Sequence, residues 1–233
     1  MHNSEDHPLS QSFAKWVYSA DFPCVGAKSA LAKGQIRFVI GRDFQSASDD
    51  RAIHSALMKF AKEYAHNKTL FQSLVVLYES GAPNNEELFE TQMWHHLNSL
   101  TRKDTWLGQP ADDRVSSDPE DPHFSLSFGG EAFFVVGLHP EASRPARCFS
   151  VPAMVFNVHD QFEQLRAQQR YTKLRASIMA RDEKLAGTIN PMLANHGSIS
   201  EARQYSGRAV AGDWQCPFAG REETGKNGHR SAH

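Results

Sequence analysis

The fold is decided by residues 133–162, FFVVGLHPEASRPARCFSVPAMVFNVHDQF. Two apolar runs within this stretch, FFVVGL and AMVFNV, predict strands that are buried on both faces of a sheet. His139 and His159 follow these runs, and Arg144 and Arg147 lie between them on a loop punctuated by prolines. Because ligands of α/β sheets bind where strands end and loops begin, the four side chains suggest a site for iron or an anion. Each histidine taken alone also fits a structural role.

Strand and helix patterns extend outward from this stretch. The sequence predicts strands at 34–41, 70–78 and 154–158, helices at 46–66, 86–100, 161–169 and 171–185, and a hairpin turning at Gly129-Gly130. The remainder, to Phe218, has mostly irregular patterns. We therefore expect the α/β class, as a single domain with a mixed β-sheet flanked by helices and an irregular C-terminal segment.

Composition narrows the class of protein. With 233 residues, 40% of them hydrophobic, the chain can bury one sizeable core. A net charge of −2 argues against bulk electrostatic binding to nucleic acid. No apolar run reaches the roughly 18 residues that span a bilayer, and the polar N-terminus does not resemble a secretory signal. Three cysteines then predict reduced thiols and a cytoplasmic location. Residues 1–12 and 219–233 are expected to be disordered tails.

The sequence lacks the motifs of several common cofactor, nucleotide and metal sites. The chain has no GxGxxG after a strand and no GxxxxGK[ST], so nicotinamide, flavin and nucleotide sites are unsupported. It has no Cys-x-x-Cys-His, which excludes covalent attachment of haem in the c-type manner. His95 and His96 are adjacent, so they do not form the i, i+4 pair of a zinc-binding HExxH helix.

The chain resembles the YqcI/YcgG family from about Phe13 to Phe218. The matching segments, in order, are FPCVGAKSAL (22–31), VVGLHPEASRPARCF (135–149), VFNVHDQFEQLR (155–166), INPML (189–193), SEARQYSGR (200–208) and WQCPF (214–218). The resemblance implies a cytoplasmic haem protein occupying residues 13–218. Characterised relatives N-hydroxylate guanidino groups of arginine-like amino acids, as in guanitoxin biosynthesis. Family members often carry an arginine where this chain has Cys148.

The implied cofactor is a non-covalent haem b, which needs an axial ligand to its iron, an apolar slot and partners for two propionates. Three side chains are candidates for the axial ligand: His139, ranked first, then His159 and Cys216. A thiolate at Cys216 would push electron density onto the iron, whereas a buried apolar thiol is the structural alternative.

Charged side chains supply the remaining candidates. Arg144 and Arg147 can pair with propionates or with a substrate carboxylate, and Lys28 could do the same. A planar, cationic guanidine calls for a carboxylate and polar acceptors, for which Glu201 and Tyr205 are the catalytic candidates. Glu163 is a further candidate that also fits a solvated helix face.

The expected function is a haem-dependent monooxygenase that N-hydroxylates a guanidino or related nitrogen of a small, arginine-like amino acid. Dioxygen or peroxide would be the oxidant, with a separate electron donor where dioxygen is used. Two alternatives stay open: a haem sensor or carrier without turnover, and a non-haem enzyme with His139, His159 and a carboxylate such as Asp160 or Glu163 as metal ligands. We expect the protein to bind neither nucleic acid nor a membrane. The sequence leaves the oligomeric state open, a homodimer included.

Overall fold

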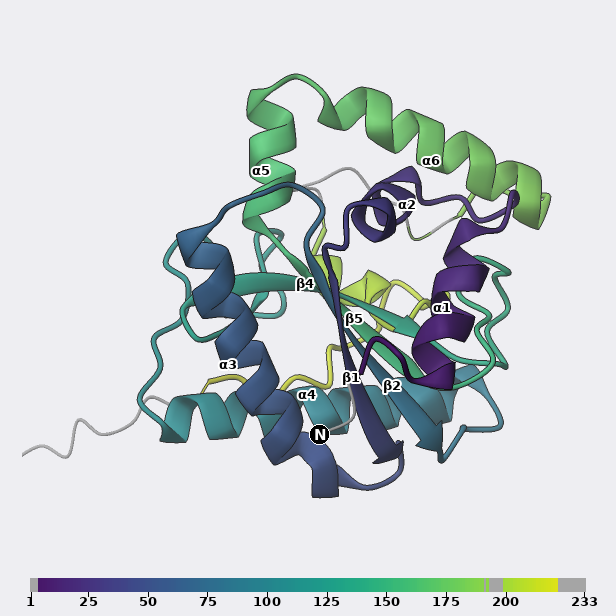
Figure 1. The fold of residues 1–233 in the computed structure, drawn as a ribbon. Coiled ribbons are helices and arrows are strands. Elements are labelled where there is room, and N and C mark those ends of the chain that lie inside the picture. Colours follow the sequence, from purple (N-terminus) through teal and green to yellow (C-terminus); the bar gives the residue numbers. More distant parts are fainter. Residues whose placement is uncertain (1–3, 191, 193–198, 222–233) are drawn as a thin grey trace, which may run out of the picture.

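Five strands form one mixed sheet in the order β1-β2-β5-β4-β3. The computed structural model describes residues 4–190, 192 and 199–221 (Figure 1). The strands are β1 (Ile36–Asp43), β2 (Ser73–Ser80), β3 (Leu126–Phe128), β4 (Glu131–Leu138) and β5 (Ala153–Val158). β1 and β2 are parallel, and every other neighbouring pair is antiparallel. The expected mixed sheet is thereby confirmed.

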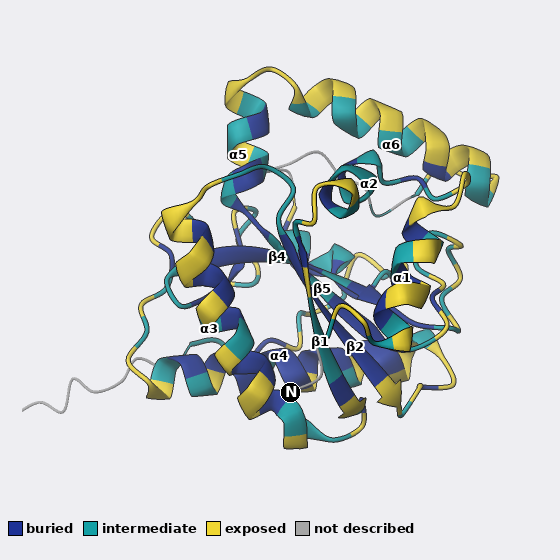
Figure 2. Cartoon of the chain, in the orientation of Figure 1, coloured by how far each residue is buried: buried dark blue, intermediate teal, exposed yellow. Residues whose placement is uncertain are grey.

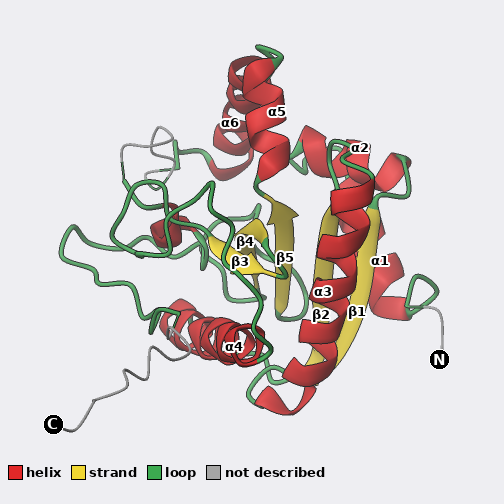
Figure 3. Cartoon of the chain, turned by 90° about the vertical axis from the view of Figure 1, so that its left-hand side faces the viewer, coloured by secondary structure: helices red, strands yellow, loops and turns green. Residues whose placement is uncertain are grey.

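Helices cover both faces of this sheet, as expected for an α/β domain. They are α1 (Pro8–Tyr18), α2 (Val25–Ala32), α3 (Asp50–His66), α4 (Glu86–Trp106), α5 (Asp160–Ala167) and α6 (Tyr171–Ala186), with short 3₁₀ helices η1 (Ala47–Asp49) and η2 (Glu201–Gln204). α3 and α4 pack on one face, and α1 and α2 pack on the other. Figure 3 shows α5 and α6 together at the end of the sheet where β5 ends.

Strand alternation divides the apolar residues between the two faces. In β2, Leu74 and Val76 face α3 and α4, whereas Val75 and Leu77 face α1 and α2. All four are fully or almost fully buried, which explains why β2 is a continuous apolar run and does not alternate with polar residues.

The hairpin between β3 and β4 turns at the expected position. Gly129 and Gly130 both have positive φ, 61° and 81°, which a type I′ hairpin turn requires and side chains disfavour. The glycine pair therefore sets the register in which Phe128 lies opposite Glu131.

Described residues near both ends of the chain belong to the packed fold, contrary to expectation. α1 begins at Pro8, and its Phe13 and Val17 are buried, so assigning residues 8–12 to a disordered tail was wrong. Neither α1 nor α2 was expected from the sequence. At the other end, Arg221 donates hydrogen bonds to Asp104 in α4 and to the Ser127 carbonyl. The rest of the expected C-terminal tail, 222–233, lies outside the described residues.

α6 differs from the other long helices in its burial (Figure 2). Asp182 is the buried residue that this 16-residue helix contributes. Its inner side bears Tyr171, Leu174 and Ile178, which are half-buried. α6 therefore roofs part of the second face without filling the space beneath it. Within the described chain, no helix combines the length and apolar character needed to cross a membrane.

Candidate functional site

The structure separates the two histidines that the sequence analysis grouped. β4 and β5 are antiparallel, so their C-terminal ends lie at opposite ends of the sheet. His159 is bonded through its backbone to Ala132 at the start of β4, and His139 follows seven residues further along. At about 3.3 Å per residue the two lie roughly 20 Å apart along the strand. A non-haem site with both histidines and one carboxylate is therefore wrong for this fold.

His139 is enclosed in the core on the α4 side of the sheet. Its ring stacks on Phe89 at 4.2 Å between centroids and is 1% exposed. Burial lowers the pKa of His139 to about 4, so the ring is neutral at pH 7. None of the cavities described below reaches this side chain. His139 would have to leave its stack on Phe89 to bind a ligand, although its Nδ1 has no hydrogen-bond partner among the described residues.

Tyr205 and Cys216 also belong to the α4-side core. Tyr205 stacks on Trp94, and its hydroxyl donates a hydrogen bond to the Phe133 carbonyl. Cys216 packs against the same core, and burial raises the pKa of its thiol to about 12. A thiol with that pKa is protonated at neutral pH. Neither side chain lines the cavities on the opposite face.

That opposite face holds a slot between the sheet and α6, made of three adjoining chambers. The arginine chamber, about 230 Å³, is lined by residues that include Trp16, Cys24, Val136, Arg144, Arg147 and Asp182. The central chamber, about 200 Å³, is lined by residues that include Cys24, Gly26, Phe71, Asn157, Gln161 and Leu174. The glutamate chamber, about 210 Å³, is lined by residues that include Phe134, Tyr171, Arg175, Glu201 and Gln204. Ile178 of α6 borders all three.

Arg144 closes one end of the slot. Its Nη2 donates to Asp182 Oδ2 at 2.5 Å and to the Thr188 carbonyl at 3.0 Å, which ties the loop after β4 to the end of α6. Its Nε is buried and has no hydrogen-bond partner within the described residues. This guanidinium lines the arginine chamber, so it brings a positive charge and hydrogen-bond donors to that end of the slot.

Arg147 lines the same chamber but has a largely structural set of contacts. It donates to the carbonyls of Gly137, Tyr205 and Gln204 at 3.0, 3.2 and 3.0 Å. Burial lowers its pKa to about 10, so it is still cationic at neutral pH. Arg147 therefore joins the segment after η2 to β4 and adds positive charge beside Arg144. Lys28, by contrast, does not line the slot: its Nζ donates to the Ser19 carbonyl at 2.6 Å.

Cys24 is the cysteine that lines the slot among the described residues, bordering both the arginine and central chambers. It is the N-cap of α2, and its Sγ accepts a hydrogen bond from Ala27 N at 3.4 Å. Gly26 lies beside it, and a Cβ at that position would crowd the Phe71 ring at 3.3 Å. The sequence analysis quoted FPC as a family segment but did not select Cys24. A cysteine just before a helix start, where thiolates are stabilised, is the signal that was missed.

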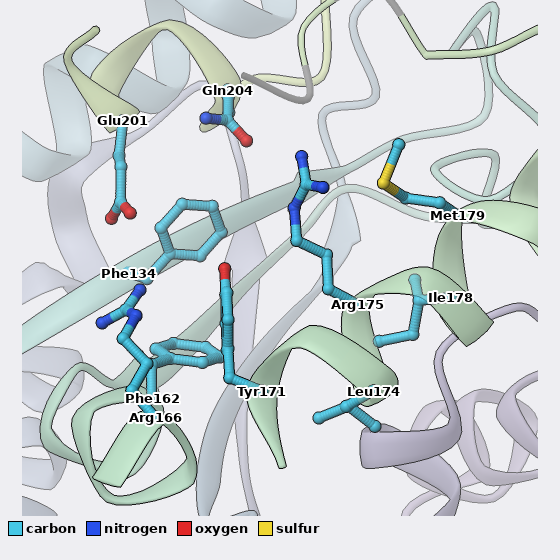
Figure 4. A pocket seen from close by; sticks show the side chains of 10 residues that line it. All are labelled: Phe134, Phe162, Arg166, Tyr171, Leu174, Arg175, Ile178, Met179, Glu201 and Gln204. Carbon is cyan, nitrogen blue, oxygen red and sulfur yellow. The ribbon is translucent and has the colours of Figure 1, made fainter. Parts of the chain in front are cut away.

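The glutamate chamber brings a carboxylate and two arginines together (Figure 4). Glu201 enters from η2, Arg166 from α5 and Arg175 from α6. Glu201 Oε2 also lies 4.0 Å from His159 Nε2, beside a small cavity of about 40 Å³ that Glu163 lines as well. Of the two catalytic candidates, Glu201 therefore borders the slot and Tyr205 does not. Of the histidines, His159 lies at its edge.

Two further residues of the slot escaped the sequence analysis. Asn157 interrupts the apolar run of β5, and on the slot face its Oδ1 accepts from Ser73 Oγ at 2.7 Å. Arg175 shares one side of α6 with Tyr171, Ile178 and Asp182, at spacings of three or four residues. A polar residue within a buried strand and a charged residue on the inner stripe of a helix are recognisable from sequence alone.

The slot has the features that a flat, apolar cofactor with acidic groups at one edge requires. Its walls are mainly apolar, Cys24 offers a soft sulfur donor, and Arg144 at one end has a buried Nε with no partner among the described residues. Together the chambers reach the volume usual for ligand sites, about 300–1,000 Å³. Among residues 4–190, 192 and 199–221, no three His, Cys, Asp or Glu side chains are arranged to hold a metal ion on their own.

A comparison with protein families gives a match over almost the whole chain. Residues 13–219 match the family model described as the YqcI/YcgG family. Neither the curated proteins nor the solved structures give a match. The match covers most of the chain, including every strand and the whole slot. The chain therefore belongs to the YqcI/YcgG family.

Proposed function

We propose that the protein is a cytoplasmic, haem-dependent monooxygenase that N-hydroxylates the guanidino group, or a related nitrogen, of a small arginine-like amino acid. The observation that carries the proposal is the slot on the α6 side of the sheet, with Cys24 in its wall and arginines at its ends. The reaction class comes from the family resemblance, and the slot supplies a place where this chain's residues could hold the cofactor and substrate.

Cys24 is the side chain best placed to ligate iron. Its sulfur borders two chambers of the slot, whereas His139 and Cys216 lie in the opposite core. Burial raises the pKa of the Cys24 thiol, and the N-terminus of α2 beside it favours the thiolate once a metal is bound. Arg144 and Arg147 would then hold the propionates at the end of the slot. Haem b supplies the activation of dioxygen or peroxide when bound.

The remaining residues position the substrate and exclude water. Glu201 would receive the cationic nitrogen in the glutamate chamber, which adjoins the central chamber across Phe134 and Phe162. α6 roofs the slot, so bound substrate would be shielded from bulk water. With dioxygen as oxidant, one oxygen atom enters the N–OH group and the other leaves as water, using two electrons from a separate donor.

The test is an absorption and electron paramagnetic resonance spectrum of protein expressed with haem supply. We expect a Soret band and a thiolate signature that Cys24→Ser abolishes and the matched control Cys216→Ser retains. Loss of the band in His139→Phe, with Cys24→Ser unaffected, would restore His139 as the axial ligand. Absence of any Soret band in the parent protein would contradict the proposal.

Turnover then separates an enzyme from a haem carrier or sensor. The haem-loaded protein is incubated with arginine-like amino acids, with an electron donor and dioxygen or with peroxide. We expect mass spectrometry to show the gain of one oxygen atom on the guanidino nitrogen. A Soret band without any oxygenated product would favour the carrier or sensor.

A further inference from the structure

We propose that the glutamate chamber binds both charged ends of a zwitterionic amino acid, with Arg175 receiving its carboxylate and Glu201 receiving its cationic side-chain group. This inference rests on the proposed function for the class of substrate, and it adds the residue that recognises the amino-acid end. It also distinguishes the substrate site from Arg144 and Arg147, which lie in the arginine chamber at the other end of the slot.

The two charged groups enter one chamber from different elements. Figure 4 shows the Glu201 carboxylate and the Arg175 guanidinium on either side of the Phe134 and Tyr171 rings. Glu201 and Gln204 are three residues apart on η2, so both face the chamber from the same 3₁₀ turn. A ligand that meets both charges must carry opposite charges at its two ends, with an apolar part against the rings.

Arg175 is better suited than Arg166 to receive the carboxylate. Arg166 forms an ion pair with Glu163 and lies over the Tyr171 ring, 4.5 Å from its centroid. Figure 4 shows its guanidinium on the same side of the Phe134 and Tyr171 rings as Glu201, whereas Arg175 lies on the other side. Arg175 is half-buried one turn after Tyr171, on the inner side of α6, and presents the planar fork of donors that matches a carboxylate.

The size of the chamber restricts its occupant. Its volume of about 210 Å³ lies below the usual range for drug-sized ligands, about 300–1,000 Å³, so it suits a single amino acid. Phe134, Phe162 and Leu174 also line the central chamber. An amino acid bound between Glu201 and Arg175 would therefore lie directly beside the space proposed for the cofactor.

Isothermal titration calorimetry with three probes tests this arrangement. L-arginine carries both charged ends, agmatine lacks the carboxylate, and L-citrulline replaces the guanidinium with a neutral urea. Because a charge-assisted hydrogen bond is lost in each case, the parent protein should bind L-arginine roughly tenfold to a hundredfold more tightly than either analogue. Titrations are run on haem-loaded and on haem-free protein.

The variants assign each end of the ligand to its residue. Arg175→Gln should weaken L-arginine binding roughly tenfold to a hundredfold and leave agmatine binding unchanged. Glu201→Gln should weaken L-arginine to a similar extent and leave L-citrulline unchanged. Arg181→Gln and Glu183→Gln, exposed on α6, are matched controls that should bind as the parent does. Arg175→Lys keeps the charge and should restore part of the affinity.

Three results would overturn the inference. They are no binding of L-arginine by the parent, equal binding of L-arginine by Arg175→Gln and Arg181→Gln, or an equal loss of agmatine and L-arginine binding in Arg175→Gln. The last would mean that Arg175 acts through the shape of the chamber, and thermal unfolding shows whether that variant is folded. Failure of the proposed cofactor is seen separately, as a missing Soret band in protein that still binds L-arginine.

Discussion

At the scale of single residues, burial controls the chemistry around the end of β4. His139 and Arg147 are joined through their backbones, His139 N to the Arg147 carbonyl at 3.1 Å, yet their side chains lie on opposite faces of the sheet. Burial lowers the pKa of both, which makes the imidazole neutral at pH 7 and leaves the guanidinium charged. The histidine therefore acts as a flat, uncharged core residue, while the arginine holds three carbonyls.

The lowered pKa of His139 predicts a loss of stability in mild acid. The pKa is about 4 in the folded protein and about 6.5 in the unfolded chain, so only the unfolded chain takes up a proton in that interval. Stability should therefore fall as pH falls from about 6.5 to about 4, by about 3 kcal/mol in total from this residue. His139→Phe keeps the stack on Phe89 and removes the titration.

The measurement is the free energy of unfolding in urea, between pH 7 and pH 4, for the parent and His139→Phe. Other titrating groups are common to both proteins, so the difference between the two curves isolates His139. Parallel curves would show that the imidazole titrates with the same pKa in the folded protein as in the unfolded chain.

At the scale of elements, α6 covers the slot with residues that are mostly half-buried or exposed. Its N-terminal end follows α5, and its C-terminal end is held by the Asp182–Arg144 ion pair, whose side chains are 8% and 11% exposed. Removing one partner of a buried ion pair leaves the other without compensation, at a cost of about 3–5 kcal/mol. Arg144 therefore ties the C-terminal end of the roof to the loop after β4, through Asp182 and the Thr188 carbonyl.

Asp182→Asn should loosen the C-terminal half of α6 without unfolding the sheet. We expect hydrogen exchange of the α6 amides to accelerate on the order of tenfold or more, because local opening becomes easier once the ion pair is lost. Amides of β2 and β5 should exchange as in the parent. Glu183→Gln, at an exposed position on the same helix, is the control, and equal exchange in the two variants would mean that the ion pair does not hold the roof.

At the scale of the whole molecule, the two faces of the sheet are packed differently. The face toward α3 and α4 carries a continuous core of aromatic and aliphatic side chains. The other face carries a smaller core together with the slot. Close packing on one side therefore supplies stability, and incomplete filling on the other leaves space for ligands.

Two neighbouring valines of β4 test this division. Val135 is fully buried against the α4-side core, whereas Val136 borders the arginine and central chambers. Val135→Ala should lower the free energy of unfolding by about 2 kcal/mol, because the lost methyls leave a cavity in packed surroundings. Val136→Ala should cost under about 1 kcal/mol, since its side chain already borders a cavity. Equal losses in denaturant unfolding would indicate that the slot is as well packed as the core.

Most elements of the fold could be predicted from short patterns in the sequence. The apolar runs of β1, β2, β4 and β5, the glycine pair of the hairpin and the stripe of α3 are each encoded within a few residues, so their elements follow from short-range sterics and periodicity. α1 was not expected, although Phe13 and Val17 are four residues apart on its buried side, since the polar residues around them mask a short stripe.

The slot is formed by segments that are distant in the sequence. The sequence alone therefore predicted only part of its lining. It identified Glu201, Arg144 and Arg147 as residues of interest, and all three line the slot. Only the antiparallel pairing of β4 and β5 decided that His139 and His159 lie far apart, and only the packing of α2 and α6 decided that Cys24 and Arg175 line the slot. The reason is that side-chain type and periodicity are local properties, whereas which strand ends meet and which face a helix covers depend on the free energy of the whole packed chain.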